Sequence, residues 1–211
     1  MVESRTPAET ADFIVRGDRA FGRVVREVGP PPRRRSAPVE QRFASLVRSV
    51  TFQLLATRAA TTIHARVEDL CQGEVTPNAV LLVGHQRLRD AGLSNAKAAA
   101  MLDLATRARA GSLRFDRHGR LDDDAVLTEI VAARGVGPWT AQMYLMHTLA
   151  RRDVWPVGDF GVRAGWSLVH GLNEPVSESE LAREGASLVG ERSAVAWYCW
   201  RALEQSRRVE R

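Results

Sequence analysis

The sequence predicts an all-α protein with about nine or ten helices. Apolar residues recur at the i, i+3, i+4, i+7 spacing of a buried helical face, and residues that cap helices stand between such segments. Apolar and polar residues do not alternate over any long stretch, so no strand is predicted. The 211 residues, 45% of them hydrophobic, suffice for a buried core, and no apolar run reaches the length of a membrane span.

The first core helix is predicted across residues 43–54. Before it, the stretch Gly29–Arg35 contains three prolines and three arginines, which predicts a linker that follows an N-terminal helix. We interpret its arginines as a solvated loop, and contact with phosphate is the alternative. The apolar positions of the core helix have helical spacing: Phe43, Leu46, Val47, Val50 and Leu54.

Two further helices are marked by residues that begin and end them. Thr76 and Pro77 form an N-cap and first-turn pair, and they open a short helix that runs to Val83. Ser94 is the N-cap of the next helix, which Gly111 ends.

Acidic residues and a capping box predict two helices in the second half of the chain. Three aspartates at 122–124 stand where the dipole of a helix N-terminus favours negative charge. Ser177 and Glu180 have the spacing of a capping box. The helix that this box opens is expected to carry Leu181, Leu188 and Val189.

Charge and cysteine content indicate what kind of partner the protein binds and exclude some kinds of site. The net charge is +5, and nearly all the basic residues are arginines, which suit bidentate contacts with phosphate. This composition favours a polyanionic partner. Cys71 and Cys199 are too few for a disulfide framework or a cysteine-rich metal site, and the five histidines have no ligand spacing. The N-terminal residues lack the pattern of a signal peptide, so a cytoplasmic protein is expected.

The residues that could bind a ligand or take part in a reaction lie in the segment 127–166. An apolar helix ends at Gly135-Val136-Gly137, and Pro138 stands in the first turn of the next helix. Backbone N–H groups at that helix start suit a phosphate oxygen and read no base. A plain turn between two helices is the alternative, and on the tripeptide alone it is the better interpretation.

Asp159 follows the loop Trp155-Pro156-Val157-Gly158 and precedes an apolar helix. Taken alone, it is best interpreted as an N-cap. A carboxylate at a helix start is also held ionised by the dipole and the backbone donors, so it suits stabilising a cationic sugar or orienting a water molecule. One residue can serve both roles.

These residues resemble a known family. GVGPWTAQM followed by DVWPVGDFGVRAGW is similar to the helix-hairpin-helix (HhH) and Gly/Pro-rich loop with Asp (GPD) of base-excision DNA glycosylases, most of all the DNA-3-methyladenine glycosylase II group. The segments VREVGPPPRRR, FASLVRSV, TRAATTIHARV, GLSNAKAAAMLDLA and RSAVAWYCWRALE match in the same order, so the resemblance covers residues 10 to 205.

The resemblance implies two helical lobes with a central DNA-binding cleft, built from residues 1–211 as one compact unit. Residues 127–150 match the helix-hairpin-helix, and residues 153–166 match the Gly/Pro-rich loop with Asp159 as the catalytic residue. In the family the hairpin contacts DNA phosphate, and the residues expected to do so here are Gly135, Val136, Gly137 and Thr140. A sodium or potassium ion is expected at the backbone of Arg134 and Val136, with no other cofactor.

The reaction type implied by the resemblance depends on Trp139. Relatives that also cleave the strand have a lysine there, which attacks the sugar and forms a Schiff base, and tryptophan cannot do this. Hydrolysis by water is therefore expected. Trp139, Met143 and Leu188 are expected to line the base pocket, where an aromatic face attracts a cationic alkylated purine. Core packing is the alternative for Trp139. For Tyr198 and Trp200, on the last helix, core packing is the default and a position in the cleft is the alternative.

Gln53 and Leu54 match the region that fills the gap left by the flipped base. Core packing of Leu54 is equally compatible with the sequence. Phe52, Leu54, Arg134 and Leu188 depart from the usual family pattern, with Gly190 where proline is common, and these departures leave the base preference open. Two distant cysteines cannot supply the four ligands of the iron–sulfur cluster in endonuclease III-type relatives.

The leading hypothesis is a monofunctional glycosylase that removes an alkylated purine of the 3-methyladenine type in base excision repair. Its expected partner is double-stranded DNA with a damaged base, bound by a monomer that associates with the nucleoid and not with a membrane. A non-catalytic DNA-binding protein on the same scaffold is the main alternative. A helical adaptor that uses the hairpin to bind protein is a third, and it leaves the pairing of Trp139 with Asp159 unexplained.

Overall fold

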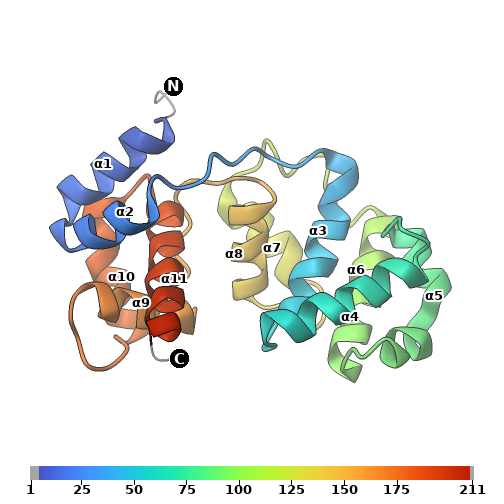
Figure 1. Ribbon diagram of the computed structural model, residues 1–211. Coiled ribbons are helices and arrows are strands. Elements are labelled where there is room, and N and C mark those ends of the chain that lie inside the picture. Colours follow the sequence, from blue (N-terminus) through green and yellow to red (C-terminus); the bar gives the residue numbers. More distant parts are fainter. Residues whose placement is uncertain (1–4, 210–211) are drawn as a thin grey trace. The chain divides into compact units, whose positions relative to one another are not determined.

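The computed structural model describes residues 5–209, which form helices and connecting loops with no strand among them (Figure 1). The chain divides into two compact units, unit 1 with residues 1–34 and 151–211 and unit 2 with residues 35–150. The predicted all-α fold with two helical lobes is confirmed. Within the described part of the chain there are eleven α-helices and two 3₁₀ helices, slightly more than predicted. No described helix is both long and apolar enough to cross a membrane.

Unit 2 consists of six helices. Helix α3 contacts α4, α6 and α8, while α5 packs on α6 and α7 packs on α8. Four of the five apolar residues predicted for the first core helix are buried on α3, and the fifth, Leu54, lies beyond its end. The helices are α3 (Val39–Phe52), α4 (Thr57–Leu70), α5 (Pro77–Asp90), α6 (Asn95–Ala110), α7 (Asp123–Val131) and α8 (Pro138–His147).

Local capping signals correctly predicted the starts of α5, α6 and α7 and the end of α6. The side chains of Thr76, Ser94 and Asp122 accept hydrogen bonds from backbone N–H groups in the first turns of α5, α6 and α7. Gly111 ends α6 in the left-handed conformation, with φ of 75°. The helix opened by Thr76 is interrupted after Val83 as predicted, because Gly84 has φ of 73°, but helical structure then resumes and continues to Asp90.

A buried polar cluster holds the loop before α7 against α8. His118 is fully buried, with Nδ1 2.9 Å from the Tyr144 hydroxyl and Nε2 3.1 Å from Oε2 of Glu129. Burial lowers the pKa of His118 and raises the pKa of Tyr144, so both are neutral at pH 7. Neutral His118 therefore accepts from Tyr144 and donates to Glu129, which satisfies both ring nitrogens.

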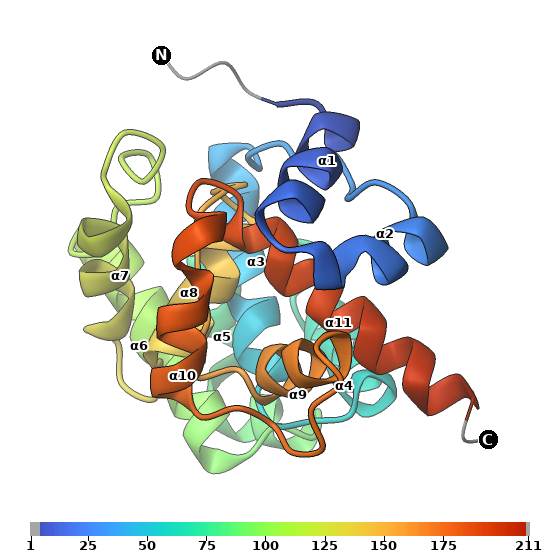
Figure 2. The ribbon, with the colours of Figure 1, turned by 90° about the vertical axis from the view of Figure 1, so that its left-hand side faces the viewer.

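Unit 1 is assembled from the two ends of the chain. Helix α9 packs along α11, and α2 also contacts α11 (Figures 1 and 2). The residues Gly29–Arg35 form the predicted linker after α2. The elements are α1 (Pro7–Gly17), η1 (Arg19–Phe21), α2 (Gly22–Val28), α9 (Phe160–Val169), α10 (Glu178–Glu184), η2 (Gly185–Leu188) and α11 (Arg192–Val209).

The capping box of Ser177 and Glu180 is present at the start of α10, but the helix it opens is shorter than predicted. Helix α10 ends at Glu184, Leu188 closes the 3₁₀ helix η2, and Val189 follows in a loop with extended backbone. Gly185 is the residue at which the α-helix α10 gives way to the 3₁₀ helix η2. A Cβ atom there would approach Trp155 Nε1 to 2.5 Å, so the close packing of Trp155 requires glycine at this position.

Helices α9 and α11 approach each other closely at Gly165. A Cβ atom on Gly165 would lie 2.0 Å from the carbonyl oxygen of Cys199, well inside van der Waals contact. Trp166, beside it, packs edge-on against Phe21 and Trp155, with ring centroids 5.6 and 5.9 Å apart. The helices can come this close only because residue 165 has no side chain.

Replacing Gly165 with alanine is expected to lower the free energy of unfolding by about 3 kcal/mol or more, because two helix backbones must separate. Equilibrium unfolding in urea measures the change. Gly22→Ala is the matched control, since a Cβ atom there would meet its nearest neighbour at 3.5 Å, and its effect is expected to stay within about 1 kcal/mol. Equal effects of the two variants would contradict the packing argument.

Candidate active site

The hairpin turn between α7 and α8 has the geometry that its glycines predicted. Gly135 has φ of 74°, a conformation that favours glycine, and a Cβ atom there would lie 3.3 Å from Cβ of Ala100. Gly137 is the N-cap of α8 with φ of −94°, and Pro138 begins the helix. A Cβ on Gly137 would meet nothing within 4 Å, so the approach to the start of α8 is open on this side.

The hairpin is held from beneath by α6. The backbone N–H of Arg134 donates to Oδ2 of Asp103 over 2.7 Å, and Nε of Arg107 donates to the same oxygen over 2.9 Å. The hydrogen bond from Arg107, and then that from Arg134, hold the pKa of Asp103 below its ordinary value. Asp103 therefore fixes the turn as an ionised carboxylate.

Thr140 supports the hairpin from inside unit 2. It is buried, its backbone N–H donates to the carbonyl of Gly137 over 3.1 Å, and its hydroxyl accepts from Nε2 of Gln53 over 2.6 Å. Its polar groups are thus used within the protein. Of the residues predicted to contact phosphate, Gly135 and Gly137 are exposed, while Val136 and Thr140 are buried.

The loop after α3 presents Leu54 to solvent. Leu54 is fully exposed and has φ of 52°, and Leu55 beside it is also exposed. Lys97 on α6 donates from Nζ to the carbonyls of Thr51 and Gln53 over 2.9 and 2.6 Å, and burial lowers the pKa of its ammonium group. The interpretation of Leu54 as a core residue is therefore wrong, because the helix ends at Phe52 and the chain turns outward.

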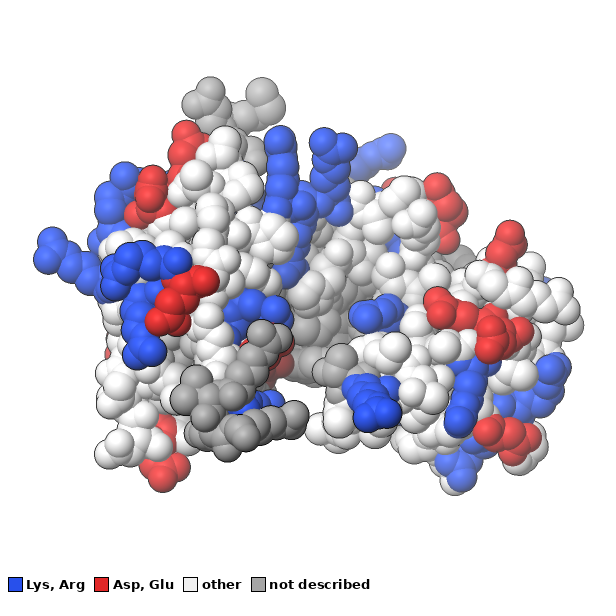
Figure 3. Space-filling view, viewed as in Figure 1, with Lys and Arg blue, Asp and Glu red and all other residues white. Residues whose placement is uncertain are grey.

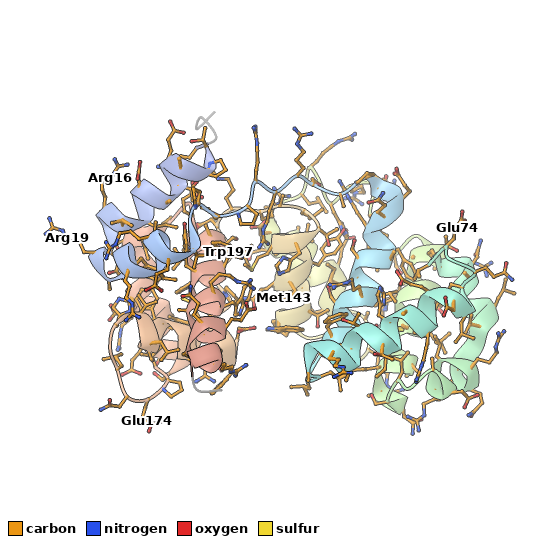
Figure 4. The ribbon with its side chains drawn as sticks, viewed as in Figure 1. Arg16, Arg19, Glu74, Met143, Glu174 and Trp197 are labelled. Carbon is orange, nitrogen blue, oxygen red and sulfur yellow. The ribbon has the colours of Figure 1, made fainter. Side chains whose placement is uncertain are left out.

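Trp139 and Met143 lie one turn apart on α8, so their side chains share a face of that helix. Trp139 is partly buried, and Met143 is buried (Figure 4). Both belong to unit 2, as do Gln53 and Leu54, whereas Asp159 and Leu188 belong to unit 1.

Asp159 is the N-cap of α9, as predicted. Its Oδ1 accepts from the backbone N–H of Val162 over 2.8 Å and from Nε1 of Trp200 over 3.0 Å. Its own N–H donates to the carbonyl of Pro156 over 2.9 Å, which closes the Gly/Pro-rich loop. Trp200 was expected to pack in the core or to reach the cleft, but its contact with Asp159 could not be predicted, because the two residues are 41 positions apart.

A network of hydrogen bonds joins the start of the Gly/Pro-rich loop to the start of α11. Ser193 donates to the carbonyl of Arg151 over 2.8 Å and accepts from the N–H of Val154 over 3.0 Å. Arg192 binds both carboxylate oxygens of Asp153 over 2.7 Å each. Burial acts to raise the pKa of Asp153, but Arg192 and the N–H of Gly190 hold it below its ordinary value.

Comparisons with known proteins extend the similarity over most of the chain. No protein-family model matches. DNA-3-methyladenine glycosylase 1 of Schizosaccharomyces pombe is 26% identical over 187 residues, which cover 87% of this chain and 82% of the yeast protein. The structure of the 3-methyladenine DNA glycosylase from that yeast, in complex with abasic DNA, superposes with a TM-score of 0.85 at 25% identity and covers 91% of this chain and 95% of its own. A DNA-3-methyladenine glycosidase structure from Bacillus halodurans has a TM-score of 0.77 at 29% identity, over 92% of this chain and 88% of its own.

The chain has the fold of the helix-hairpin-helix DNA glycosylases and is similar to 3-methyladenine glycosylases over most of its length.

The lysine content of the chain bears on the reaction type. Lys97 is the only lysine in the sequence, and its amine is hydrogen-bonded to two backbone carbonyls of unit 2. The position that resembles the lysine of strand-cleaving members holds Trp139. A Schiff base with the sugar requires a lysine amine that can attack as a nucleophile, and neither position offers one.

Leu188 does not offer a surface to a base. It is fully buried in unit 1, where its side chain packs against Gly17 of α1 so closely that a Cβ on Gly17 would lie 3.0 Å from it. Leu188 therefore packs the core of unit 1 instead of lining an open pocket. Tyr198 is also fully buried, and its hydroxyl donates to the carbonyl of Gly29, which matches the core packing expected for it.

Basic side chains gather over α1 and α2 of unit 1, where Arg16 and Arg19 are exposed (Figures 3 and 4). Arg23 and Arg26 continue this exposed face, although Arg23 donates to Glu27 over 2.9 Å. Such a face raises the local concentration of a polyanion without reading a base.

Replacing Lys97 with methionine is expected to loosen the loop at residues 53–56, because both hydrogen bonds to backbone carbonyls disappear while the apolar stem remains. Hydrogen bonds from a charged donor contribute about 1.5–3 kcal/mol each, so amide exchange at these residues is expected to rise at least about tenfold. Hydrogen exchange measured by mass spectrometry tests this, with Lys97→Arg as the charge-retaining control. Unchanged exchange in Lys97→Met would show that the loop does not depend on Lys97.

Proposed function

We propose that this protein is a monofunctional DNA glycosylase that hydrolyses the N-glycosidic bond of an alkylated purine of the 3-methyladenine type in double-stranded DNA. The observation that carries the proposal is the Asp159 carboxylate, which is fixed at the start of α9 by the N–H groups of Val162 and Trp200. The relatives named as 3-methyladenine glycosylases and the complex of one of them with abasic DNA support the substrate class.

The reaction needs a negative charge beside the sugar more than it needs an acid. As the glycosidic bond breaks, its electron pair goes to the cationic base, which leaves neutral, and the sugar becomes an oxocarbenium-like cation. Asp159 stabilises that cation electrostatically, an effect that grows where water is excluded. A water molecule then adds to C1′ and loses its proton, leaving an abasic site with both phosphodiester bonds intact.

The hairpin supplies binding that is independent of sequence. The exposed turn at Gly135 and Gly137 places the N-terminus of α8, with the positive end of its dipole, toward solvent. A DNA phosphate binds there. A sodium or potassium ion on the carbonyls of Arg134 and Val136 fits this turn in chemistry, because neutral carbonyl oxygens suit a monovalent cation, and it would bridge the hairpin to phosphate.

Leu54 acts as the wedge that fills the gap left by the flipped nucleotide. Its exposure and its fixed loop suit this role, since an apolar side chain held out of the protein can replace a base in the stack. Trp139 contributes an aromatic face for a cationic purine. The protein acts as a monomer in the cytoplasm, where it associates with the nucleoid.

The Asp159→Asn variant tests the reaction. Asparagine keeps a cap acceptor for α9 but removes the negative charge, so base release is expected to fall at least about 100-fold while affinity for DNA is retained. Chromatography of bases released from methylated duplex DNA measures 3-methyladenine and 7-methylguanine. Treatment with borohydride during the reaction is expected to trap no covalent complex. If the wild type binds duplex DNA but releases no base, the non-catalytic alternative replaces this proposal.

The Leu54→Ala variant tests the wedge. It is expected to slow excision from duplex DNA about tenfold, because the flipped state loses the side chain that prevents the base from returning to the stack, while excision from single-stranded DNA stays nearly unchanged. Leu82→Ala is the matched control, since Leu82 is an equally prominent exposed leucine of unit 2. A similar loss with both DNA forms would contradict the wedge role.

A further inference from the structure

Two neutral donors converge on one oxygen of the Asp159 carboxylate. The N–H of Val162 reaches Oδ1 over 2.8 Å from within the same helix start, and the indole N–H of Trp200 reaches the same atom over 3.0 Å from α11. The first contact is what any N-cap aspartate makes. The second is not needed for capping, because it comes from a different helix.

The packing of α9 on α11 is what brings the indole within reach. A Cβ atom on Gly161 would lie 3.0 and 3.2 Å from Cδ1 and Nε1 of Trp200, and 3.1 Å from Oδ1 of Asp159. Gly165, one turn later on the same face, touches the backbone of Cys199, the residue before Trp200. Two glycines one turn apart therefore leave room for the indole between the helix and the carboxylate.

We infer that Trp200 is a positioning residue for Asp159: its indole N–H fixes the rotation of the carboxylate at the start of α9. The inference rests on the proposed function, because a fixed carboxylate matters only if it faces a developing cation. A single hydrogen bond to Oδ1 restrains rotation about Cβ–Cγ, and a second donor on the same oxygen, from a different helix, narrows the range that remains. Both donors carry no formal charge, so they orient the carboxylate without forming an ion pair with it.

The Trp200→Phe variant removes the N–H and keeps an aromatic ring in place. Trp197→Phe is the matched control, because Trp197 is a partly buried tryptophan on the same helix whose ring contacts Tyr198, with centroids 4.9 Å apart (Figure 4). Three quantities are measured for each protein. They are the single-turnover rate of base excision, the affinity for duplex DNA with a neutral tetrahydrofuran or a cationic pyrrolidine in place of the damaged nucleotide, and the melting temperature.

Trp200→Phe is expected to slow excision about tenfold, which corresponds to about 1.4 kcal/mol of transition-state stabilisation. Its affinity for the cationic pyrrolidine DNA is expected to fall by a similar factor, while its affinity for the neutral tetrahydrofuran DNA stays at the wild-type value. A residue that only packs the helices would lower both affinities together with the melting temperature. That pattern, or an unchanged excision rate, overturns the inference.

Gly161→Ala provides a second variant on the opposite side of the contact. Its methyl group crowds both the indole and Oδ1, so it disturbs their contact with Trp200 still present, and the same selective loss of cationic affinity is expected. The failure of the two proposals can be distinguished. If the wild type excises no base, the proposed function fails and the inference falls with it; if the wild type is active and Trp200→Phe is equally active, only the positioning role is wrong.

Discussion

The contact between α9 and α11 at Gly165 is the constraint on which the carboxylate site depends. Because residue 165 has no side chain, the backbone of Cys199 lies directly against α9, and the next residue, Trp200, reaches Asp159. The start of α11 is joined to the start of the Gly/Pro-rich loop through Ser193, and again through Arg192. The loop is thus held at both ends by one helix, so Asp159 is positioned by rigid elements even though it stands in a loop.

Unit 2 uses the same principle for the residues that we propose to face DNA. Leu54 and Gly135 are both exposed. Helix α6 supports both, because Lys97 binds the loop that carries Leu54 and Asp103 binds the turn. A side chain that must enter a base stack cannot be packed in the protein, so its position has to be fixed through the backbone on either side of it.

The part of the site that could be predicted from sequence is the part that local chemistry determines. The resemblance implied the roles of Asp159 and Gly135 at the site. Their local geometry was recognisable, Asp159 as an N-cap because the residues it caps are its neighbours in the chain, and Gly135 because a tight turn demands a positive φ. Trp200 was not, since its contact depends on helix packing across 41 positions. Leu54 followed the helical spacing of α3, yet the helix ends at Phe52, and periodicity alone does not show where a helix ends.

The donors around Asp159 are consistent with a substrate that is already charged. The amide of Val162 and the indole of Trp200 hold their protons far above neutral pH, so neither can give a proton to a departing base. A neutral purine would need such an acid, because its nitrogen must accept the bonding electrons as the sugar leaves. An alkylated purine carries the positive charge from the start, so an oriented carboxylate and a water molecule are sufficient. These two donors hold the anion in place without supplying a proton, which suits the lesions that need none.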